Sequence, residues 1–429
     1  MHQHPKAKPG IAANKLSRRD LILLSACGGL TLPASGWLTS LAAHAASTSS
    51  LRGKHKSCIV LFMSGGPSHI DTFDPKPANA TSGFKPIATA VPGIKICDNM
   101  PKLATKMKDM AILRGMSTSE GSHGRARYFM HTGYREGVGG VVHPSLGSIS
   151  SYFLSKPDDD LPNFFSIGGQ AYGAGYAGPF HSPVEIYDPE KGIANLKAAD
   201  SLAELDKRAQ LLSELENSFV DRVQTAGADA HRATYSRTVK LMHSEKAKAF
   251  DISQEPDSVR NAYGRSKFGE GCLLARRLIE AGVAFVEVVL NGWDTHRNNE
   301  SKIKSLTESL DPAFSTLIAD LKDRGRLDDT LIVWMGDFGR TPRLGRQGGR
   351  DHYPRAWSTV LAGGGLKTGQ VIGGTDREGA NVVNGVVSAV DFMATICKAL
   401  GINYEKNLYA GSRPMRVVNK GEKVVTALF

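Results

Sequence analysis

Residues 309–340 read SLDPAFSTLIADLKDRGRLDDTLIVWMGDFGR, which passes from a helical pattern through a turn into a short apolar strand. Residues 272–296, CLLARRLIEAGVAFVEVVLNGWDTH, follow the same order, with Gly282 at the turn. Each unit ends in a loop that carries an acidic residue. Successive helix-to-strand units of this kind are typical of a parallel sheet covered by helices. The two stretches therefore predict an α/β fold whose strand-end loops gather at one edge of the sheet.

Three other apolar runs extend the predicted sheet. SCIVLFMSGG at residues 57–66 is continuously apolar, which fits a strand buried on both faces and followed by a loop. DMAILRGMS at residues 109–117 repeats this pattern, and WSTVLAGGG at residues 357–365 supplies a further strand. Catalytic and binding residues of α/β proteins collect at the carboxyl ends of parallel strands. We therefore expect the functional residues to lie in the loops that follow these strands.

Helical patterns account for most of the remaining chain. GRARYFMHTGY at residues 124–134 predicts a helix that Gly133 closes, and residues 386–402 predict another helix near the C-terminus. Residues 195–250 are charged, with apolar residues three and four positions apart. We interpret that segment as a helical insertion, a solvated amphipathic hairpin in an otherwise single domain over residues 46–429.

Composition narrows the class of protein. The 429 residues are 41% apolar and 7% aromatic, which is enough to bury a large core. The net charge is +11, and the mildly basic surface that it implies suits an anionic substrate. No run of lysine and arginine with interleaved aromatic residues occurs, so we expect no nucleic-acid partner.

The first 45 residues have the pattern of a twin-arginine signal peptide. Arg18-Arg19 precede the apolar tract of SRRDLILLSACGGLTLPASGWLTSLAAHAAS, and Ala43-His44-Ala45 fits a cleavage site. This predicts a protein that the twin-arginine export machinery carries to the periplasm or the medium. LSAC at residues 24–27 is a rival lipoprotein box that would place a lipid on Cys27, but it lies too close to the arginines for a full apolar core. No later segment reaches the roughly 18 apolar residues of a membrane span, so the mature chain should lack one.

Four cysteines remain after residue 45: Cys58, Cys97, Cys272 and Cys397. An even number allows disulfides in an oxidising compartment. Three of the four, Cys58, Cys272 and Cys397, lie in apolar strand or helix patterns, where a small buried thiol is the commoner explanation.

Asp337-Phe338-Gly339 spells a kinase magnesium motif, but its context contradicts a kinase. HRNN at residues 296–299 lacks the carboxylate of a catalytic loop, and no strand lysine follows the glycines of residues 173–178. Those glycines also fail as a dinucleotide loop, because Pro179 and Pro183 stand where a helix should start.

The strand-end loops carry aspartate and histidine in patterns that suit a divalent cation. Asp294 and His296 stand two apart at an extended strand end, so their side chains can point the same way. Asp337 follows the next strand between two glycines. Asp351 and His352 precede a further strand, and because adjacent side chains diverge, we expect one to bind and the other to support it. Each pattern alone also fits a turn or a helix cap.

Two more loops carry polar clusters. MSGGPSHIDTFDPKP at residues 63–77 contains Ser64, Ser68, His69, Asp71 and Asp74. SEGSHGRARYFMHTGYRE at residues 119–136 contains Ser122, His123, Arg125, Arg127 and His131. No G-x-S-x-G elbow occurs, which disfavours a serine hydrolase. Acids and imidazoles together suit zinc, manganese, calcium or magnesium, and two such ions about 4 Å apart could clamp an ester displacement.

In combination these motifs resemble a known family. The leader, GGPSHIDTFDPKP, LLARRLIEAGVAFVEV, GWDTH, GDFGRTPR, GRDHY and GGGLKTGQVIGGTD, in this order, are similar to the exported bacterial family called domain of unknown function 1501. That family belongs to the alkaline phosphatase and sulfatase-like superfamily. The resemblance implies a three-layer sandwich with a mostly parallel central sheet, one or two divalent metal ions, and a nucleophile that attacks sulfate or phosphate esters.

The resemblance also implies roles for individual residues. Asp294, His296 and His352 resemble one metal set, and Asp337 resembles a ligand of a second metal. Asp71 would have to reach back to serve as the first-strand acid. SHGRARYFMHTGYR resembles the sulfatase nucleophile segment, which places the nucleophile on His123, with Ser122 beside it, and the supporting arginine on Arg127.

Two departures from the superfamily pattern leave alternatives open. Phe338 stands where the superfamily has a histidine, and His123 stands where it has serine, threonine or a modified cysteine. The leading hypothesis is an exported metal-dependent hydrolase of sulfate or phosphate esters, with sulfated glycans among its possible substrates. The competing hypothesis is a non-catalytic metal-binding protein that retains the fold.

Overall fold

The computed structural model describes residues 56–76, 82–156, 159–193, 196, 201–223 and 226–429. The predicted signal peptide, with Arg18-Arg19 and Cys27, lies outside the described residues. The remainder of the chain, from Lys54 to Phe429, forms one compact unit. No helix in the described part is both long and apolar enough to cross a membrane.

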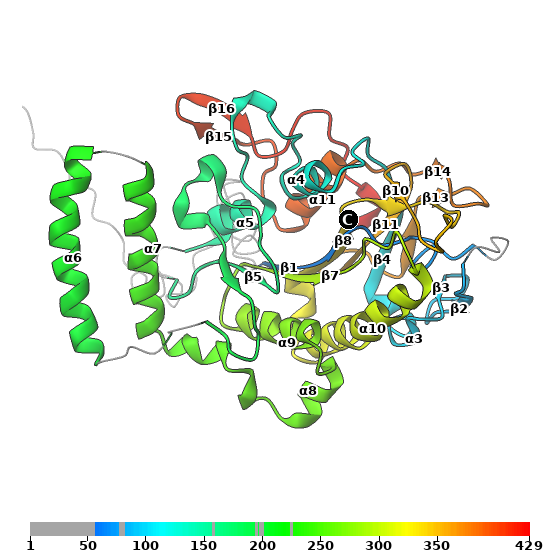
Figure 1. The fold of residues 1–429 in the computed structure, drawn as a ribbon, viewed down its shortest axis with the longest axis horizontal. Helices are drawn as coiled ribbons and strands as arrows, with labels where there is room; N and C mark the ends of the chain where they lie inside the picture. Colours follow the sequence, from blue (N-terminus) through cyan, green and yellow to red (C-terminus); the bar gives the residue numbers. More distant parts are fainter. Residues whose placement is uncertain (1–55, 77–81, 157–158, 194–195, 197–200, 224–225) are drawn as a thin grey trace, which may run out of the picture. The chain divides into compact units, whose positions relative to one another are not determined.

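An eight-stranded sheet forms the centre of this unit (Figure 1). Its strands, in spatial order, are β12 (Gln370–Ile372), β4 (Met110–Met116), β11 (Trp357–Gly363), β8 (Thr330–Gly336), β1 (Ser57–Ser64), β7 (Phe285–Asn291), β5 (Phe164–Ile167) and β6 (Val184–Ile186). The strands pair in parallel except for β11, which is antiparallel to both of its neighbours. The predicted α/β class with a mostly parallel sheet is confirmed.

The reversed direction of β11 decides which end of that strand lies at the edge where the parallel strands end. Trp357, at its start, pairs with Met116 at the end of β4, while Gly363, at its end, pairs with Leu331 near the start of β8. Residues that precede β11 therefore arrive at the same sheet edge as residues that follow the parallel strands. His352, which precedes β11, reaches that edge in this way.

Helices cover both faces of the sheet (Figure 1). One face is covered by α3 (Pro101–Ala104), α8 (Asp257–Tyr263), α9 (Lys267–Glu280) and α10 (Asn299–Asp323), and the other by α4 (His123–Thr132), α5 (Leu146–Leu154) and α11 (Ala389–Ala399). Side chains of β1 alternate between the two cores. Ile59, Leu61 and Met63 pack with α9 and α10, whereas Phe62 packs with α4 and α11. The strand is buried on both faces, as its apolar run predicts.

The remaining elements are peripheral. Residues in the predicted insertion form α6 (Leu202–Val223) and α7 (Ala226–His243), which pack against each other. Four two-stranded ribbons complete the unit: β2 (Pro86–Ala88) with β3 (Lys95–Cys97), β9 (Gly339–Arg340) with β10 (His352–Tyr353), β13 (Gly374–Thr375) with β14 (Val382–Asn384), and β15 (Asn407–Ala410) with β16 (Arg413–Arg416).

Two glycines after β1 let three strand-end loops meet. A side chain at Gly65 would lie 2.4 Å from the backbone nitrogen of Asp294, and one at Gly66 would lie 2.6 Å from the carbonyl oxygen of Phe338. Both glycines also have positive φ angles, 112° and 79°, which other residues adopt only with strain. The loops that follow β1, β7 and β8 can therefore contact one another directly.

All four cysteines of the described part are free and buried. This confirms the expectation for Cys58, Cys272 and Cys397, and Cys97 shares the same state.

Candidate functional site

Three histidines and one aspartate converge at the sheet edge where β1, β7 and β8 end. His123 is the first residue of α4, Asp294 and His296 follow β7, and His352 begins β10. The sequence predicted each of these residues as a candidate. The fold brings them together from three separate segments of the chain.

Each of the three imidazoles is fixed through its Nδ1 atom. His123 Nδ1 lies 2.5 Å from Asp337 Oδ2, His296 Nδ1 lies 3.0 Å from Asp351 Oδ1, and His352 Nδ1 lies 2.8 Å from the carbonyl oxygen of Gly121. All three partners are acceptors, so each Nδ1 donates its proton in these bonds. In the neutral form of such a ring the Nε2 atom carries a lone pair, and this is the form that binds a metal ion.

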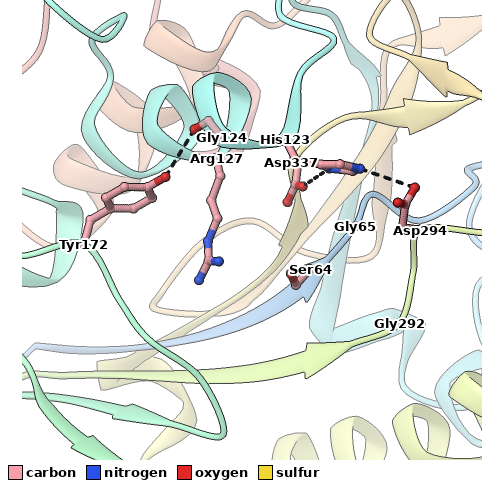
Figure 2. A pocket seen from close by; sticks show the side chains of 9 residues that line it. All are labelled: Ser64, Gly65, His123, Gly124, Arg127, Tyr172, Gly292, Asp294 and Asp337. Carbon is pink, nitrogen blue, oxygen red and sulfur yellow. Dashed lines mark hydrogen bonds and ion pairs between the residues drawn. The ribbon is translucent and has the colours of Figure 1, made fainter.

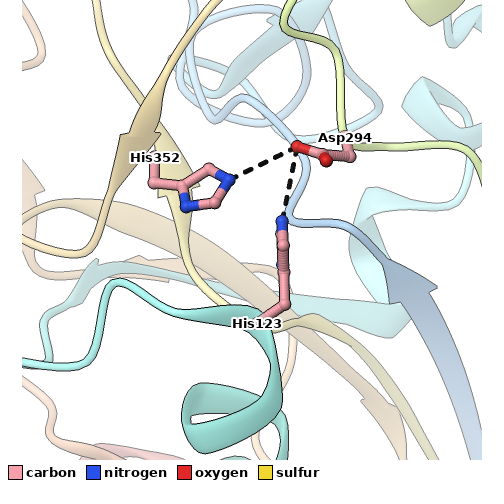
Figure 3. A group of neighbouring side chains, drawn as sticks. All are labelled: His123, Asp294 and His352. Atoms are coloured by element: carbon pink, nitrogen blue, oxygen red, sulfur yellow. Dashed lines mark ion pairs between the residues drawn. The ribbon is translucent and has the colours of Figure 1, made fainter.

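The three Nε2 atoms lie around one carboxylate oxygen, and Figure 3 shows two of them, those of His123 and His352. Asp294 Oδ1 lies 3.3 Å from Nε2 of His123, 3.1 Å from that of His296 and 3.4 Å from that of His352. The Nε2 atoms of His296 and His352 are 3.0 Å apart. Four electron-rich atoms this close repel one another unless a proton or a cation lies among them.

A divalent cation fits this arrangement. Ligand atoms that lie 2.0–2.1 Å from a tetrahedral zinc ion are roughly 3.3 Å from one another, close to the separations found here. His123, Asp294 and His352 each offer an atom within 4.8 Å of the other two, and His296 adjoins Asp294 and His352. The chemistry of the donors, imidazole with one carboxylate, is that of zinc or manganese sites.

The charge states of two of the ligands suit a cation. Although burial acts to raise the pKa of Asp294, the hydrogen bond and positive charge of Arg340 lower it to about 2, so the carboxylate is ionised. Burial is the main cause of the lowered pKa of His352, which keeps that ring neutral. These are the forms in which aspartate and histidine bind metals.

The Nε2 atom of His123 can bind either a proton or a cation. Its hydrogen bond to Asp337 is the main cause of its raised pKa, with the charge of Asp294 contributing. Its buried Nε2 atom has no hydrogen-bond partner. A proton on this atom would occupy the place that a cation would take, so the two compete.

Phe338 occupies the position where the superfamily resemblance implies a histidine. Its fully buried ring stacks on His123 at 4.7 Å and 26°, and lies 4.7 Å from the ring of His352. It therefore forms a wall behind two of the imidazoles. His123 supplies an imidazole beside Asp337 from a different segment of the chain.

A pocket of about 340 Å³ opens beside the cluster (Figure 2). Its lining residues are Ser64, Gly65, His123, Gly124, Arg127, Tyr172, Gly292, Asp294 and Asp337. Arg127 contributes a cation, held by a 2.6 Å hydrogen bond from Nη2 to the carbonyl oxygen of Gln170 and by packing over Phe62. Pockets of this size accommodate small organic ligands.

The structure does not bring Asp71 or Ser122 into this group. Asp71 is fully buried and receives hydrogen bonds of 2.7 and 3.0 Å from the guanidinium of Arg350, with a third from Asn299. Ser122 precedes α4 as its N-cap residue and is absent from the described lining of the pocket. Asp351 contacts His296, which matches the supporting role expected for one member of the Asp351-His352 pair.

Arg340 and Tyr172 are two site residues that the sequence did not single out. Arg340 is fully buried and contacts Asp294 as well as the carbonyl oxygens of Gly65 and Gly66. Tyr172 lines the pocket, and its hydroxyl donates to the carbonyl oxygen of Gly124. The arginine in GDFGR was visible in the strand-end motif, whereas Tyr172 lies in a glycine-rich loop that has no signal of its own.

Solved structures with a similar arrangement include a sulfatase, PsFucS1 from Pseudoalteromonas sp., at 13% identity and a TM-score of 0.40 over 86% of this chain and 72% of that one. The lipoteichoic acid synthase LtaP from Listeria monocytogenes has 12% identity and a TM-score of 0.38 over 85% and 75% of the two chains. A magnesium-bound mutant of TAB5 alkaline phosphatase has 13% identity and a TM-score of 0.38 over 82% and 100%. A sequence search of the curated proteins found no match.

A family match covers all of the residues that the structure describes. Residues 55–429 match the family described as "Protein of unknown function (DUF1501)". The chain belongs to this family, as the order of its motifs predicts.

Proposed function

We propose that this member of the DUF1501 family is a metal-dependent hydrolase of sulfate or phosphate esters. The observation that carries the proposal is the convergence of three imidazole Nε2 atoms on one carboxylate oxygen, with every Nδ1 atom already committed to an acceptor. A divalent ion bound there would polarise an ester oxygen and stabilise the negative charge that develops on it.

The protein's own groups around that position suit an anionic ester. Arg127 places a guanidinium in the pocket next to His123 and Asp294, where it can pair with a sulfate or phosphate group. Arg340 forms an ion pair with Asp294, which neutralises part of the negative charge of this carboxylate and fixes its position. The pocket has a volume of about 340 Å³, which is enough for an ester of modest size. The superfamily resemblance of the GWDTH, GDFGR and GRDHY motifs points to the same reaction class.

The test combines elemental analysis with an ester panel. Protein purified from its native exported form should contain a tightly bound divalent metal and turn over para-nitrophenyl sulfate or para-nitrophenyl phosphate. Asp294→Ala and His352→Ala should each lose the metal and reduce turnover by about 100-fold or more, because each removes one ligand. Asp323→Asn, an exposed acid on α10, is the matched control and should change neither quantity.

Two outcomes would contradict the proposal in different ways. If both ligand variants keep the metal content of the wild type, the metal site is assigned to the wrong residues. If one ion is bound through these residues but neither ester is turned over, the protein is a non-catalytic metal-binding member of the fold.

We also propose that the protein is exported by the twin-arginine machinery and acts in the periplasm or outside the cell. The support is the Arg18-Arg19 pair before an apolar tract and a small-residue cleavage site. Replacing both arginines by lysine should leave the precursor in the cytoplasm. Normal appearance of the mature protein in the periplasm or medium would contradict this.

A further inference from the structure

We propose that Ser64, at the end of β1, is the nucleophile of this site. The inference rests on the proposed function and identifies the group that forms the covalent intermediate. It replaces His123 and Ser122, the nucleophile candidates suggested by the superfamily resemblance. Of the nine residues described around the pocket, Ser64 is the one with an aliphatic hydroxyl.

The alternation of β1 places Ser64 beneath α4. Phe62 belongs to the core under α4, and Ser64, two residues further along the strand, points to the same face. Arg127 lies over the ring of Phe62, 5.0 Å from its centroid. His123 precedes Arg127 by one helical turn, on the same side of α4. Ser64 therefore lies below the part of α4 between His123 and Arg127 (Figure 2). All three residues line the pocket.

Asp337 lies beside Ser64 on the neighbouring strand. β1 and β8 are parallel, and Met63 pairs with Gly336, so the next residue on each strand, Ser64 and Asp337, falls at the same level. Leu331, Val333 and Met335 share the core of Phe62, which places Asp337 on the same face as Ser64. Neighbouring strands are about 4.8 Å apart, so the hydroxyl of Ser64 and the carboxylate of Asp337 are neighbours, although no hydrogen bond joins Ser64 to Asp337 Oδ1 in this structure.

Asp337 has a free oxygen for this purpose. The residue is 1% exposed, and its Oδ2 atom binds His123. Its Oδ1 atom is buried and has no hydrogen-bond partner. A buried carboxylate oxygen without a partner is costly, so it points to a group that binds there during the reaction. The hydroxyl of Ser64, which lines the same pocket, is a group that can supply a proton to this oxygen.

The previous candidates are less well placed to act as nucleophiles. His123 donates from Nδ1 to Asp337, and its Nε2 atom points at Asp294 (Figure 3). The lone pair on Nε2 therefore faces the candidate metal ligands. Ser122 stands just before α4 and is not among the described lining residues of the pocket. Ser64 combines access to the pocket, a neighbouring carboxylate and the guanidinium of Arg127 above the same strand.

The proposed step transfers a sulfuryl or phosphoryl group to Ser64. Its Oγ atom forms a bond to sulfur or phosphorus, the bond to the ester oxygen breaks with its electron pair on that oxygen, and the Ser64 proton passes to Asp337 Oδ1. The leaving alkoxide takes up that proton and departs as an alcohol. Water then attacks the serine ester, Ser64 Oγ leaves with the bonding pair and accepts a proton from the water, and sulfate or phosphate is released.

Covalent labelling tests this assignment without relying on activity alone. The full exported protein is mixed with para-nitrophenyl phosphate or para-nitrophenyl sulfate, quenched in acid during the first turnover, digested, and analysed by mass spectrometry. The wild type should carry a phosphate or sulfate ester on Ser64. Ser64→Ala should lack this adduct and lose turnover by roughly 10³-fold or more, while its metal content and melting temperature stay at wild-type values.

The controls separate this assignment from the proposed function. Ser301→Ala removes an exposed hydroxyl on α10 and should keep full turnover and the Ser64 adduct. An adduct on Ser122 or His123, a wild type that turns over ester without any adduct on Ser64, or wild-type turnover by Ser64→Ala overturns the assignment alone. A wild type that turns over neither ester overturns the proposed function and this assignment together.

Discussion

The orientation of an imidazole decides what a histidine can do in this protein. The rings of His123, His296 and His352 bind acceptors through Nδ1 and so present Nε2 to Asp294. His181 shows the contrast, because its Nδ1 atom lies 2.9 Å from the hydroxyl of Ser151, which can donate to it. Burial and, to a smaller extent, the charge of Arg237 lower the pKa of His181 to about 4. This ring contributes to stability as a neutral group.

The lowered pKa of His181 predicts a loss of stability in acid. In the unfolded chain a histidine has a pKa near the ordinary value of 6.5, whereas the folded value is about 4. Between these values the unfolded chain binds a proton that the folded chain does not, so stability falls as the pH drops from 6.5 towards 4. The stabilisation is fully present above pH 6.5. By pH 5 the free energy of unfolding should have fallen by about 1–2 kcal/mol.

Urea unfolding at pH 7 and pH 5 measures this effect. The free energy of unfolding should fall more for the wild type than for His181→Gln, which keeps a polar side chain but cannot be protonated. The same pH dependence in both proteins would show that His181 is not the group responsible.

At the scale of elements, a buried ion pair ties two loops of the site edge together. Asp71 belongs to the loop after β1, and Arg350 lies just before β10, which carries His352. Both side chains are almost fully buried, and the guanidinium also donates to the carbonyl oxygens of Thr341 and Pro342. Asp71, predicted as a metal ligand, thus lies against a fixed guanidinium. Its position suggests that it holds the ligand-bearing segment in place.

Breaking this pair should destabilise the protein strongly. Arg350→Met leaves the Asp71 carboxylate buried without its countercharge, which costs about 3–5 kcal/mol of unfolding free energy. The double variant Asp71→Leu, Arg350→Met should recover part of that loss, because it removes the unpaired charge. Arg346→Met, an exposed arginine in the same loop, is the control and should change stability by less than about 0.5 kcal/mol. An Arg350→Met protein as stable as this control would contradict the account.

At the scale of the whole molecule, the sheet edge gathers segments that are far apart in the chain. His123 comes from α4, Asp294 from the loop after β7 and His352 from β10, and the two histidines both contact Asp294. An ion that binds all three would cross-link these segments in the folded state only. Metal binding should therefore stabilise the entire unit rather than one loop.

Removing the metal should lower the melting temperature. Ligand binding to the folded state contributes about 2.7 kcal/mol when the free ligand is at 100 times its dissociation constant, which corresponds to a few degrees in a protein of this size. Differential scanning calorimetry of native protein, before and after treatment with a chelator, gives the shift. Asp294→Ala should show the lower melting temperature in both conditions. A protein that loses its metal without any thermal shift would not bind it through these segments.

Much of the fold could be read from local patterns. The apolar run of β1 and the two helix-to-strand units ending at Asp294 and Asp337 predict parallel strands, and the structure has them. Gly133, predicted to close a helix, ends α4 with a φ angle of 71°. These features depend on neighbouring residues alone, because periodicity and turn chemistry are local properties of the chain.

The candidate site was only partly predictable. The pattern of residues 294 and 296 predicts that both side chains reach one position, and His296 Nε2 lies 3.1 Å from Asp294 Oδ1. The pattern of β11 does not reveal that this strand runs antiparallel, which is the reason that His352 reaches the edge. Tyr172 was not predicted because no spacing in the sequence marks a residue that reaches the site from a distant loop, whereas Arg340 belongs to the GDFGR motif but its contact with Asp294 depends on the fold.

By itself, the sequence determined the α/β class, the family, the buried free thiols and the set of acids and histidines from which the site is built. Only the tertiary structure decided which of them meet. It placed His123 from the start of α4 against Asp337 and Asp294, and it paired Asp71 with Arg350. It also set Ser64 in the pocket and left Ser122 at a helix cap. The physical reason is that strand direction, register and helix packing follow from burying the two faces of the sheet across the whole chain, and no local stretch contains that information.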